Sequence, residues 1–149
     1  MRELARVSER ATYQEIGRTY GERAMPVLTI TSPSNHARLE EIRQLHIRAA
    51  DPAQPPVPAA GRPVIVHLGY GVHGSETSSS EAALLTAYWL VASGTPEVER
   101  YVEQGVYHIE PVLNPDGRDR HTHGYWVGTN RLLLNAILFG SHFTVPSTP

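Results

Sequence analysis

The pattern of apolar and polar positions is typical of β-strands in two short stretches near the N-terminus of the chain. The first runs from Ala11 to Thr19 and the second from Val27 to Thr31, with a Tyr-Gly-Glu-Arg turn between them. Two strand-like stretches on either side of a turn predict a β-hairpin. Residues 32–35 (Ser-Pro-Ser-Asn) then stop the second strand and offer cap residues for a helix. That helix would place on one face Leu39, Ile42, Leu45 and Ala49.

After a connector rich in proline and alanine at residues 51–63, the apolar runs become longer. Val64–Leu68 is a short, nearly continuous apolar run bounded by turn residues, which is typical of a strand buried on both faces. A capping-box pattern, Ser78-x-x-Glu81, precedes a helix over Ala82–Ala92 that is apolar nearly all round. We expect this helix to be buried on most sides.

Two further elements complete the pattern. Thr95-Pro96 supplies an N-cap and a proline at the first helical position, which predicts a short helix ending near Gly105. Val106–Leu113 is a second apolar strand, and the turn Asn114–Gly117 follows it. Strand, helix, helix and strand in this order predict an α/β fold, a three-layer α/β/α arrangement with a mixed, mainly parallel sheet.

Composition and charge narrow the function classes. The 149 residues carry a net charge of −2, so no basic surface for nucleic acid or for an anionic membrane is expected. The chain has no cysteine, which removes disulfides and thiolate metal ligands. Residues 1–10 predict an amphipathic helical segment without the apolar core of a signal peptide, and no segment is as long as a membrane span.

The loop that follows the apolar strand 64–68 carries the strongest chemical signal. It reads Gly-Tyr-Gly-Val-His-Gly-Ser-Glu over residues 69–76. Ligands of open α/β sheets bind at the carboxyl ends of the strands. His73 and Glu76 are three residues apart, which places both side chains on the same side of a turn, and imidazole and carboxylate both bind zinc. The same spacing also occurs on solvent-exposed helix surfaces, so the spacing alone leaves both interpretations open.

Val72-His73-Gly74-Ser75-Glu76, together with Asn114-Pro115-Asp116-Gly117 at the end of the next strand, resembles the zinc carboxypeptidase family. The resemblance covers residues 11–126. It implies a metallocarboxypeptidase-type hydrolase that acts on a peptide or protein substrate, with one zinc ion as cofactor. It also implies that residues 1–126 are the N-terminal part of a zinc-peptidase domain and that residues 127–149 form a divergent or truncated tail.

By resemblance, His73 and Glu76 would be the first two zinc ligands. Arg120, or else Arg118, would polarise the scissile carbonyl or hold substrate, because a guanidinium stays charged and offers a fork of donors. A solvated loop is the alternative for this segment. The chain departs from the family at Ser75, where asparagine is usual, and at Ser79, where glycine is frequent.

The resemblance stops short of a complete active site. The third zinc ligand of the family, a histidine, and its general-base glutamate lie farther downstream than this chain extends. His142 is interpreted as a tail residue, and His121 and His123 as polar residues of a loop. We therefore expect weak zinc binding and little or no peptidase activity from this chain alone.

Two other functions remain open at this stage. Zinc-dependent acyl-amino-acid deacylases also use a His-Gly-x-Glu loop, although the Asn-Pro-Asp-Gly turn favours the peptidases. A non-catalytic remnant or binding module, in which His73 only caps the loop, is the alternative outside the hydrolases. Members of the family are often secreted or periplasmic, and the sequence does not decide the compartment.

Overall fold

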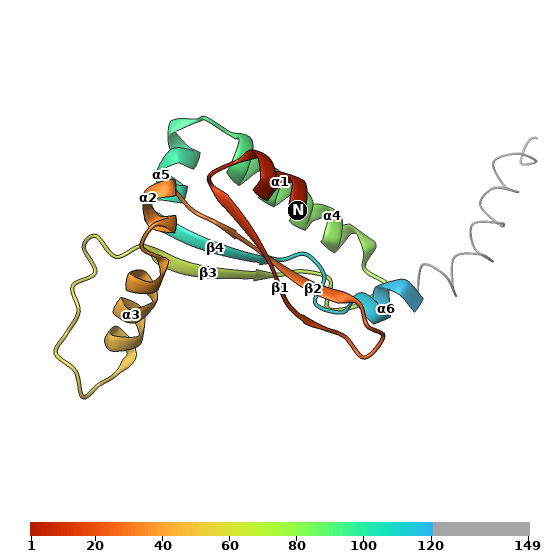
Figure 1. Ribbon diagram of the computed structural model, residues 1–149, viewed down its shortest axis with the longest axis horizontal. Coiled ribbons are helices and arrows are strands. Elements are labelled where there is room, and N and C mark those ends of the chain that lie inside the picture. Colours follow the sequence, from red (N-terminus) through yellow and green to blue (C-terminus); the bar gives the residue numbers. More distant parts are fainter. Residues whose placement is uncertain (121–149) are drawn as a thin grey trace, which may run out of the picture.

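The computed structural model describes residues 1–120, which form a four-stranded sheet with helices on both faces (Figure 1). The strand order is β1-β2-β4-β3. The strands are β1 (Ala11–Arg18), β2 (Ala24–Ile30), β3 (Val64–Gly69) and β4 (Gly105–Glu110). The β1–β2 and β2–β4 pairings are antiparallel, and β3–β4 is the parallel pairing. The sheet is therefore mixed, as predicted, although two of its three described pairings are antiparallel, whereas a mainly parallel sheet was predicted.

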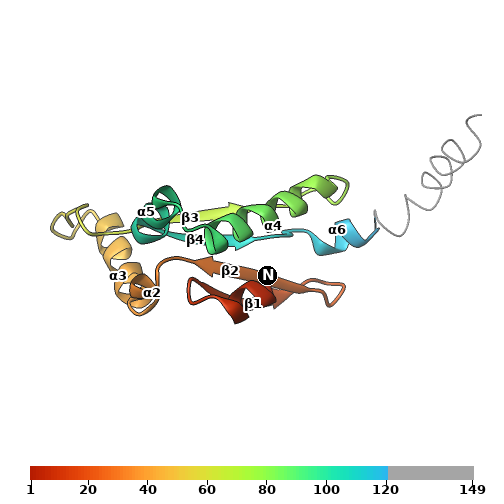
Figure 2. The ribbon, with the colours of Figure 1, turned by 90° about the horizontal axis from the view of Figure 1, so that it is seen from above.

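Six helices surround the described strands. They are α1 (Arg2–Val7), α2 (Pro33–His36), α3 (Leu39–Ala50), α4 (Thr77–Ala92), α5 (Pro96–Gln104) and α6 (Pro115–Arg120). Figures 1 and 2 show α4 and α5 on one side of the sheet and α3 on the other, which confirms the layered arrangement. No helix within residues 1–120 combines the length and the apolar character that crossing a membrane requires.

The core lies between the sheet and the α4–α5 layer. Leu28 of β2 stands opposite Ile109 of β4, and both side chains are fully buried. Ala83 and Ala87 of α4 are also fully buried. Their small side chains let the α4 backbone approach the strands closely, so the start of α4 is fixed beside the carboxyl ends of β3 and β4.

Several predicted local features are confirmed. The hairpin forms, although β2 begins at Ala24, three residues before the predicted strand. The Thr95 hydroxyl accepts a hydrogen bond from the Val98 amide and Pro96 opens α5, as the cap pattern predicted. Ser32 caps α2 by accepting from the Asn35 amide.

The predicted burial of the apolar strand and of the following helix was wrong. β3 is an edge strand of the described sheet, and Val64 and Ile65 keep 55% and 40% of their surface exposed. On α4, Leu85 and Tyr88 are 70% and 59% exposed. Burial was predicted from the apolar character of the residues on these surfaces. Within residues 1–120, however, no segment covers the outer edge of β3 or the outer face of α4.

The predicted capping box was also wrong. α4 begins at Thr77, so Ser78 lies inside the helix, and the N-cap position belongs to Glu76, which makes no side-chain cap hydrogen bond. Glu81 instead lies 3.3 Å from Arg118 of α6. The hydroxyl of Ser79 accepts a hydrogen bond from the Gly71 amide at 2.9 Å. These side chains therefore connect α4 to neighbouring segments and do not cap it.

Candidate metal centre

The loop that carries His73 is attached to the chain that continues from β4. The Tyr70 amide donates to the Glu110 carbonyl at 2.9 Å, and the Leu113 amide donates back to the Tyr70 carbonyl at 2.8 Å. These bonds extend the parallel β3–β4 ladder by several residues. Gly71 then adopts a φ of +65°, a conformation that favours glycine, and turns the loop toward α4.

His73 and Glu76 lie together at the start of α4. The Nδ1 atom of His73 is 3.2 Å from Oε1 of Glu76, and their side chains are 71% and 60% exposed. The Glu76 amide also donates to the His73 carbonyl at 3.1 Å, which closes the turn between them. Both side chains therefore project from one tight turn into solvent, where a ligand has access to them.

The geometry of this pair suits a shared zinc ion. Two ligand atoms, each about 2.0–2.2 Å from a tetrahedral ion, lie about 3.3–3.6 Å apart. The observed 3.2 Å is close to this range and also allows a hydrogen bond between the two groups in the absence of metal. Within residues 1–120 there is no group of three or more metal-binding side chains, so the described part of the chain offers two ligands to such an ion.

The Asn114–Gly117 segment forms the start of α6 and lies against the loop of residues 70–76 that carries His73 and Glu76, which is called the metal loop below. The Asn114 carboxamide accepts from the Gly117 amide at 2.9 Å and donates to the Val72 carbonyl at 3.1 Å. Gly74 fits against the backbone of Gly117, since a β-carbon on Gly74 would overlap the Gly117 carbonyl. The two sequence motifs that carry the family resemblance are thus in direct contact.

Comparison with known proteins decides the family. A sequence model of the family described as "Peptidase_M14: Zinc carboxypeptidase" matches residues 1–135. This chain belongs to the zinc carboxypeptidase family. No curated protein matches it.

Solved carboxypeptidases share the fold of this family member. A metallo-carboxypeptidase from Burkholderia cenocepacia is similar with a TM-score of 0.55 at 19% identity, over 77% of this chain and 25% of the other. Carboxypeptidase A from Helicoverpa armigera is similar with a TM-score of 0.59 at 22% identity, over 83% of this chain and 24% of the other. The chain thus spans about a quarter of the length of these solved carboxypeptidases.

The two arginines that follow the Asn114–Gly117 turn have different positions in this carboxypeptidase-family chain. Arg120 is the last residue of α6 and is exposed. Arg118 donates to the Thr77 carbonyl at 3.0 Å, in the first turn of α4. The guanidinium of Arg118 therefore lies beside the helix that begins next to Glu76. The sequence analysis had favoured Arg120 over Arg118 as the residue that contacts substrate. The assignment of Arg120 to substrate stays a prediction.

A polar cluster at the tip of the β1–β2 hairpin binds α6 and was not predicted. The Asp116 carboxylate accepts hydrogen bonds from the Thr19 hydroxyl at 2.7 Å and from the Gly21 amide at 3.0 Å. Arg23 forms ion pairs with Asp116, at 2.9 Å, and with Asp119. The partners are more than ninety positions apart in sequence, so no local pattern could reveal them. The cluster fixes α6, and α6 in turn contacts the metal loop.

The hydrogen bond from Thr19, followed by those from Gly21 and Arg23, holds the pKa of Asp116 below its ordinary value. A carboxyl with a lowered pKa stabilises the fold above its unfolded-state pKa of about 3.9, and this contribution is lost as the pH falls through that value toward the folded-state pKa. We therefore expect Asp116→Asn to have a lower urea midpoint than the wild type at pH 7, and we expect this gap to narrow as the pH is lowered from 5 to 3, because the wild type then loses part of the contribution of the ionised carboxylate. Glu9→Gln, at an exposed carboxylate, is the control. A gap between Asp116→Asn and wild type that persists unchanged at pH 3 would contradict the assignment.

The other described histidines lie away from the His73–Glu76 pair. The His67 side chain, on the edge strand β3, is 55% exposed and lies 3.1 Å from the Glu110 carboxylate. Burial, and then the nearby His67, lower the pKa of His108, which bonds the Thr29 hydroxyl at 3.0 Å. His121, His123, His142 and the predicted tail 127–149 lie outside the described residues.

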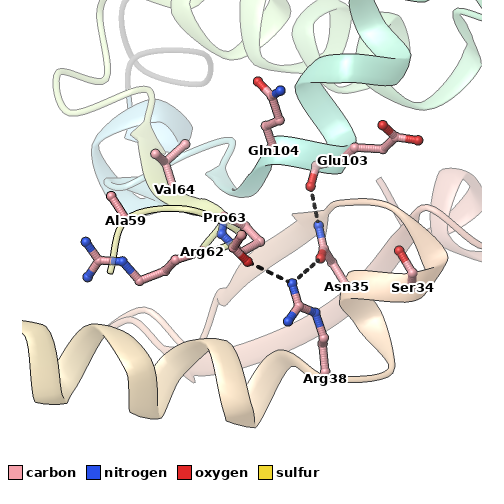
Figure 3. A pocket seen from close by; sticks show the side chains of 10 residues that line it. Ser34, Asn35, Arg38, Ala59, Arg62, Pro63, Val64, Glu103 and Gln104 are labelled. Atoms are coloured by element: carbon pink, nitrogen blue, oxygen red, sulfur yellow. Dashed lines mark hydrogen bonds between the residues drawn. The ribbon is translucent and has the colours of Figure 1, made fainter. Parts of the chain in front are cut away.

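A large hollow lies at the opposite end of β3, away from the metal loop (Figure 3). It has a volume of about 650 Å³ and borders Val64, at the amino end of the strand. Asn35 donates to the Glu103 carbonyl at 2.8 Å, and Arg38 reaches the Gly61 carbonyl at 3.3 Å. These polar groups bind the connector and the end of α5 to α2 and α3, which is a structural role.

Proposed function

We propose that His73 and Glu76 are two ligands of one zinc ion in a carboxypeptidase-type enzyme that hydrolyses peptide or protein substrates. The observation that carries this proposal is the 3.2 Å separation between His73 Nδ1 and Glu76 Oε1, on a loop at the carboxyl edge of the sheet. Membership of the zinc carboxypeptidase family supports it. Residues 1–126 would form the N-terminal part of the peptidase domain.

When bound, zinc would polarise the scissile carbonyl and lower the pKa of a coordinated water. The residues of this chain would hold that ion and shape its surroundings. His73 would bind it through Nδ1, the ring nitrogen that faces Glu76. Arg120 is proposed to hold substrate, with Arg118 as the alternative because its guanidinium lies near the start of α4. A guanidinium offers a planar fork of donors to a carbonyl or carboxylate oxygen.

This chain alone is proposed to bind zinc weakly and to hydrolyse peptides slowly or not at all. A catalytic zinc site in a hydrolase uses three protein ligands and keeps one position open for water. His73 and Glu76 would supply two, and residues 1–120 contain no group of three or more metal-binding side chains. Within residues 1–120, the open edge of β3 and the exposed apolar face of α4 fit a fold that is completed by polypeptide outside these residues.

Competition titration with a zinc-binding dye tests the ligand assignment. We expect one weak site in the wild type, and at least about tenfold weaker binding in both His73→Ala and Glu76→Ala, because each leaves a single ligand. His46→Ala is the matched control, since His46 lies on α3 and bonds the Pro63 carbonyl. Equal zinc affinity in all four proteins would exclude the proposed site.

The substrate class is tested with the zinc-loaded chain. A peptide with a free carboxyl terminus, the same peptide amidated, and an N-acyl amino acid are compared. Any residual turnover is expected with the free-carboxyl peptide alone. Turnover limited to the N-acyl amino acid would favour the deacylase alternative.

A further inference from the structure

We propose that Asn114 is a positioning residue for His73 and acts through its side-chain carboxamide. Its Nδ2 atom donates to the Val72 carbonyl at 3.1 Å, and this carbonyl belongs to the peptide unit that leads directly into His73. The Asn114 backbone amide donates to the Gly71 carbonyl at 3.1 Å. The inference rests on the proposed zinc function of His73.

Tyr70 packs against the core at the start of the metal loop, but the Val72–His73 part of the loop depends on hydrogen bonds for its position because its own side chains do not anchor it. Val72 is 53% exposed, and the side chain of His73 is 71% exposed. Glycines at positions 71 and 74 flank Val72 and His73, and glycine permits wide backbone rotation. The bond from Asn114 to the Val72 carbonyl restrains the peptide between these two glycines, and so it restrains the direction of the His73 ring.

The role requires an amide side chain. Asn114 donates through Nδ2 to Val72 while its Oδ1 accepts from the Gly117 amide at 2.9 Å, which caps α6. Aspartate and serine cap helices about as well as asparagine. Neither can replace the Nδ2 donor here, because an ionised aspartate has no donor and the serine hydroxyl is on a shorter side chain. Asparagine alone of these three serves both partners.

The test compares Asn114→Asp and Asn114→Ser with the wild type, in zinc affinity, in the absorption spectrum of the cobalt-substituted protein and in the urea midpoint of the metal-free protein. We expect both variants to bind zinc about 10–100-fold more weakly, the usual effect of losing a group that orients a metal ligand. The cobalt spectrum should change, and the metal-free urea midpoint should stay close to that of the wild type, because the cap on α6 is kept.

His73→Ala, measured in parallel, separates the two proposals. If His73→Ala binds zinc like the wild type, the proposed zinc site itself is wrong. If His73→Ala weakens binding and both Asn114 variants retain wild-type affinity, the positioning role is wrong and the zinc site stands. A loss of affinity in the Asn114 variants that is matched by a loss of metal-free stability would also overturn the positioning role, since it would show a general effect on folding.

Discussion

Replacing Gly74 by alanine is expected to separate the metal loop from α6. The new β-carbon would overlap the carbonyl group of Gly117 and lie 2.5 Å from the Arg118 amide nitrogen, whereas real β-carbons essentially never approach other atoms within 3.0 Å. Both neighbours are backbone, so neither can move aside by a change of rotamer. Overpacking of this kind costs about 1–3 kcal/mol of folding stability.

Two measurements check this result. Urea unfolding should show the loss of stability, and zinc titration should show weaker binding because His73 is next to the displaced residue. Gly94→Ala is the matched control, since a β-carbon there meets no atom within 4 Å. Wild-type stability and zinc binding in Gly74→Ala would show that the loop and α6 are not packed as described.

Truncating Leu28 to alanine is expected to cost about 2–5 kcal/mol, as is usual for a large side chain in a closed core. Leu28 is fully buried opposite Ile109, at the centre of the sheet. Folded domains are stable by about 5–15 kcal/mol in total, so this one change would remove a large part of the margin.

The urea midpoint should fall while the slope of the transition stays constant, because the surface exposed on unfolding is nearly unchanged. Ile16→Ala is the control, since Ile16 of β1 is 52% exposed. A Leu28→Ala midpoint no lower than that of Ile16→Ala would contradict the proposed core.

Local structure could be predicted from the sequence where the signal is local. The hairpin follows from the strand-like stretches on both sides of the turn at residues 20–23, and α5 follows from the Thr95 cap and Pro96. The His73–Glu76 contact follows from their spacing and from the turn that the flanking glycines allow. Each of these features depends on residues within a few positions of one another.

Burial could not be predicted in the same way. The apolar character of Val64, Ile65 and Leu85 shows that these side chains favour an apolar neighbour, but not whether the described chain supplies one. The prediction assumed that apolar neighbours cover both the strand at residues 64–68 and the helix at residues 82–92. In the described structure, the sheet covers one face of α4, and the outer edge of β3 has no strand beside it.

The contacts that connect the candidate site to the rest of the molecule could not be predicted from the sequence either. Asp116 was taken as part of a turn motif, and its bonds to Thr19, Gly21 and Arg23 appear only once the hairpin tip and α6 are placed in space. The helical start of α6 was missed as well, although an asparagine before a proline is a frequent helix start.

The zinc assignment is tested most directly by following the histidine ring nitrogens during a zinc titration. With ¹⁵N-labelled histidine, two-bond proton–nitrogen spectra report each nitrogen of the eight histidines. The His73 Nδ1 signal should shift first and saturate, and in Glu76→Ala the same shift should require at least about tenfold more zinc. If another histidine responds while His73 does not, or if His73 responds identically without Glu76, the two residues do not share a metal ion.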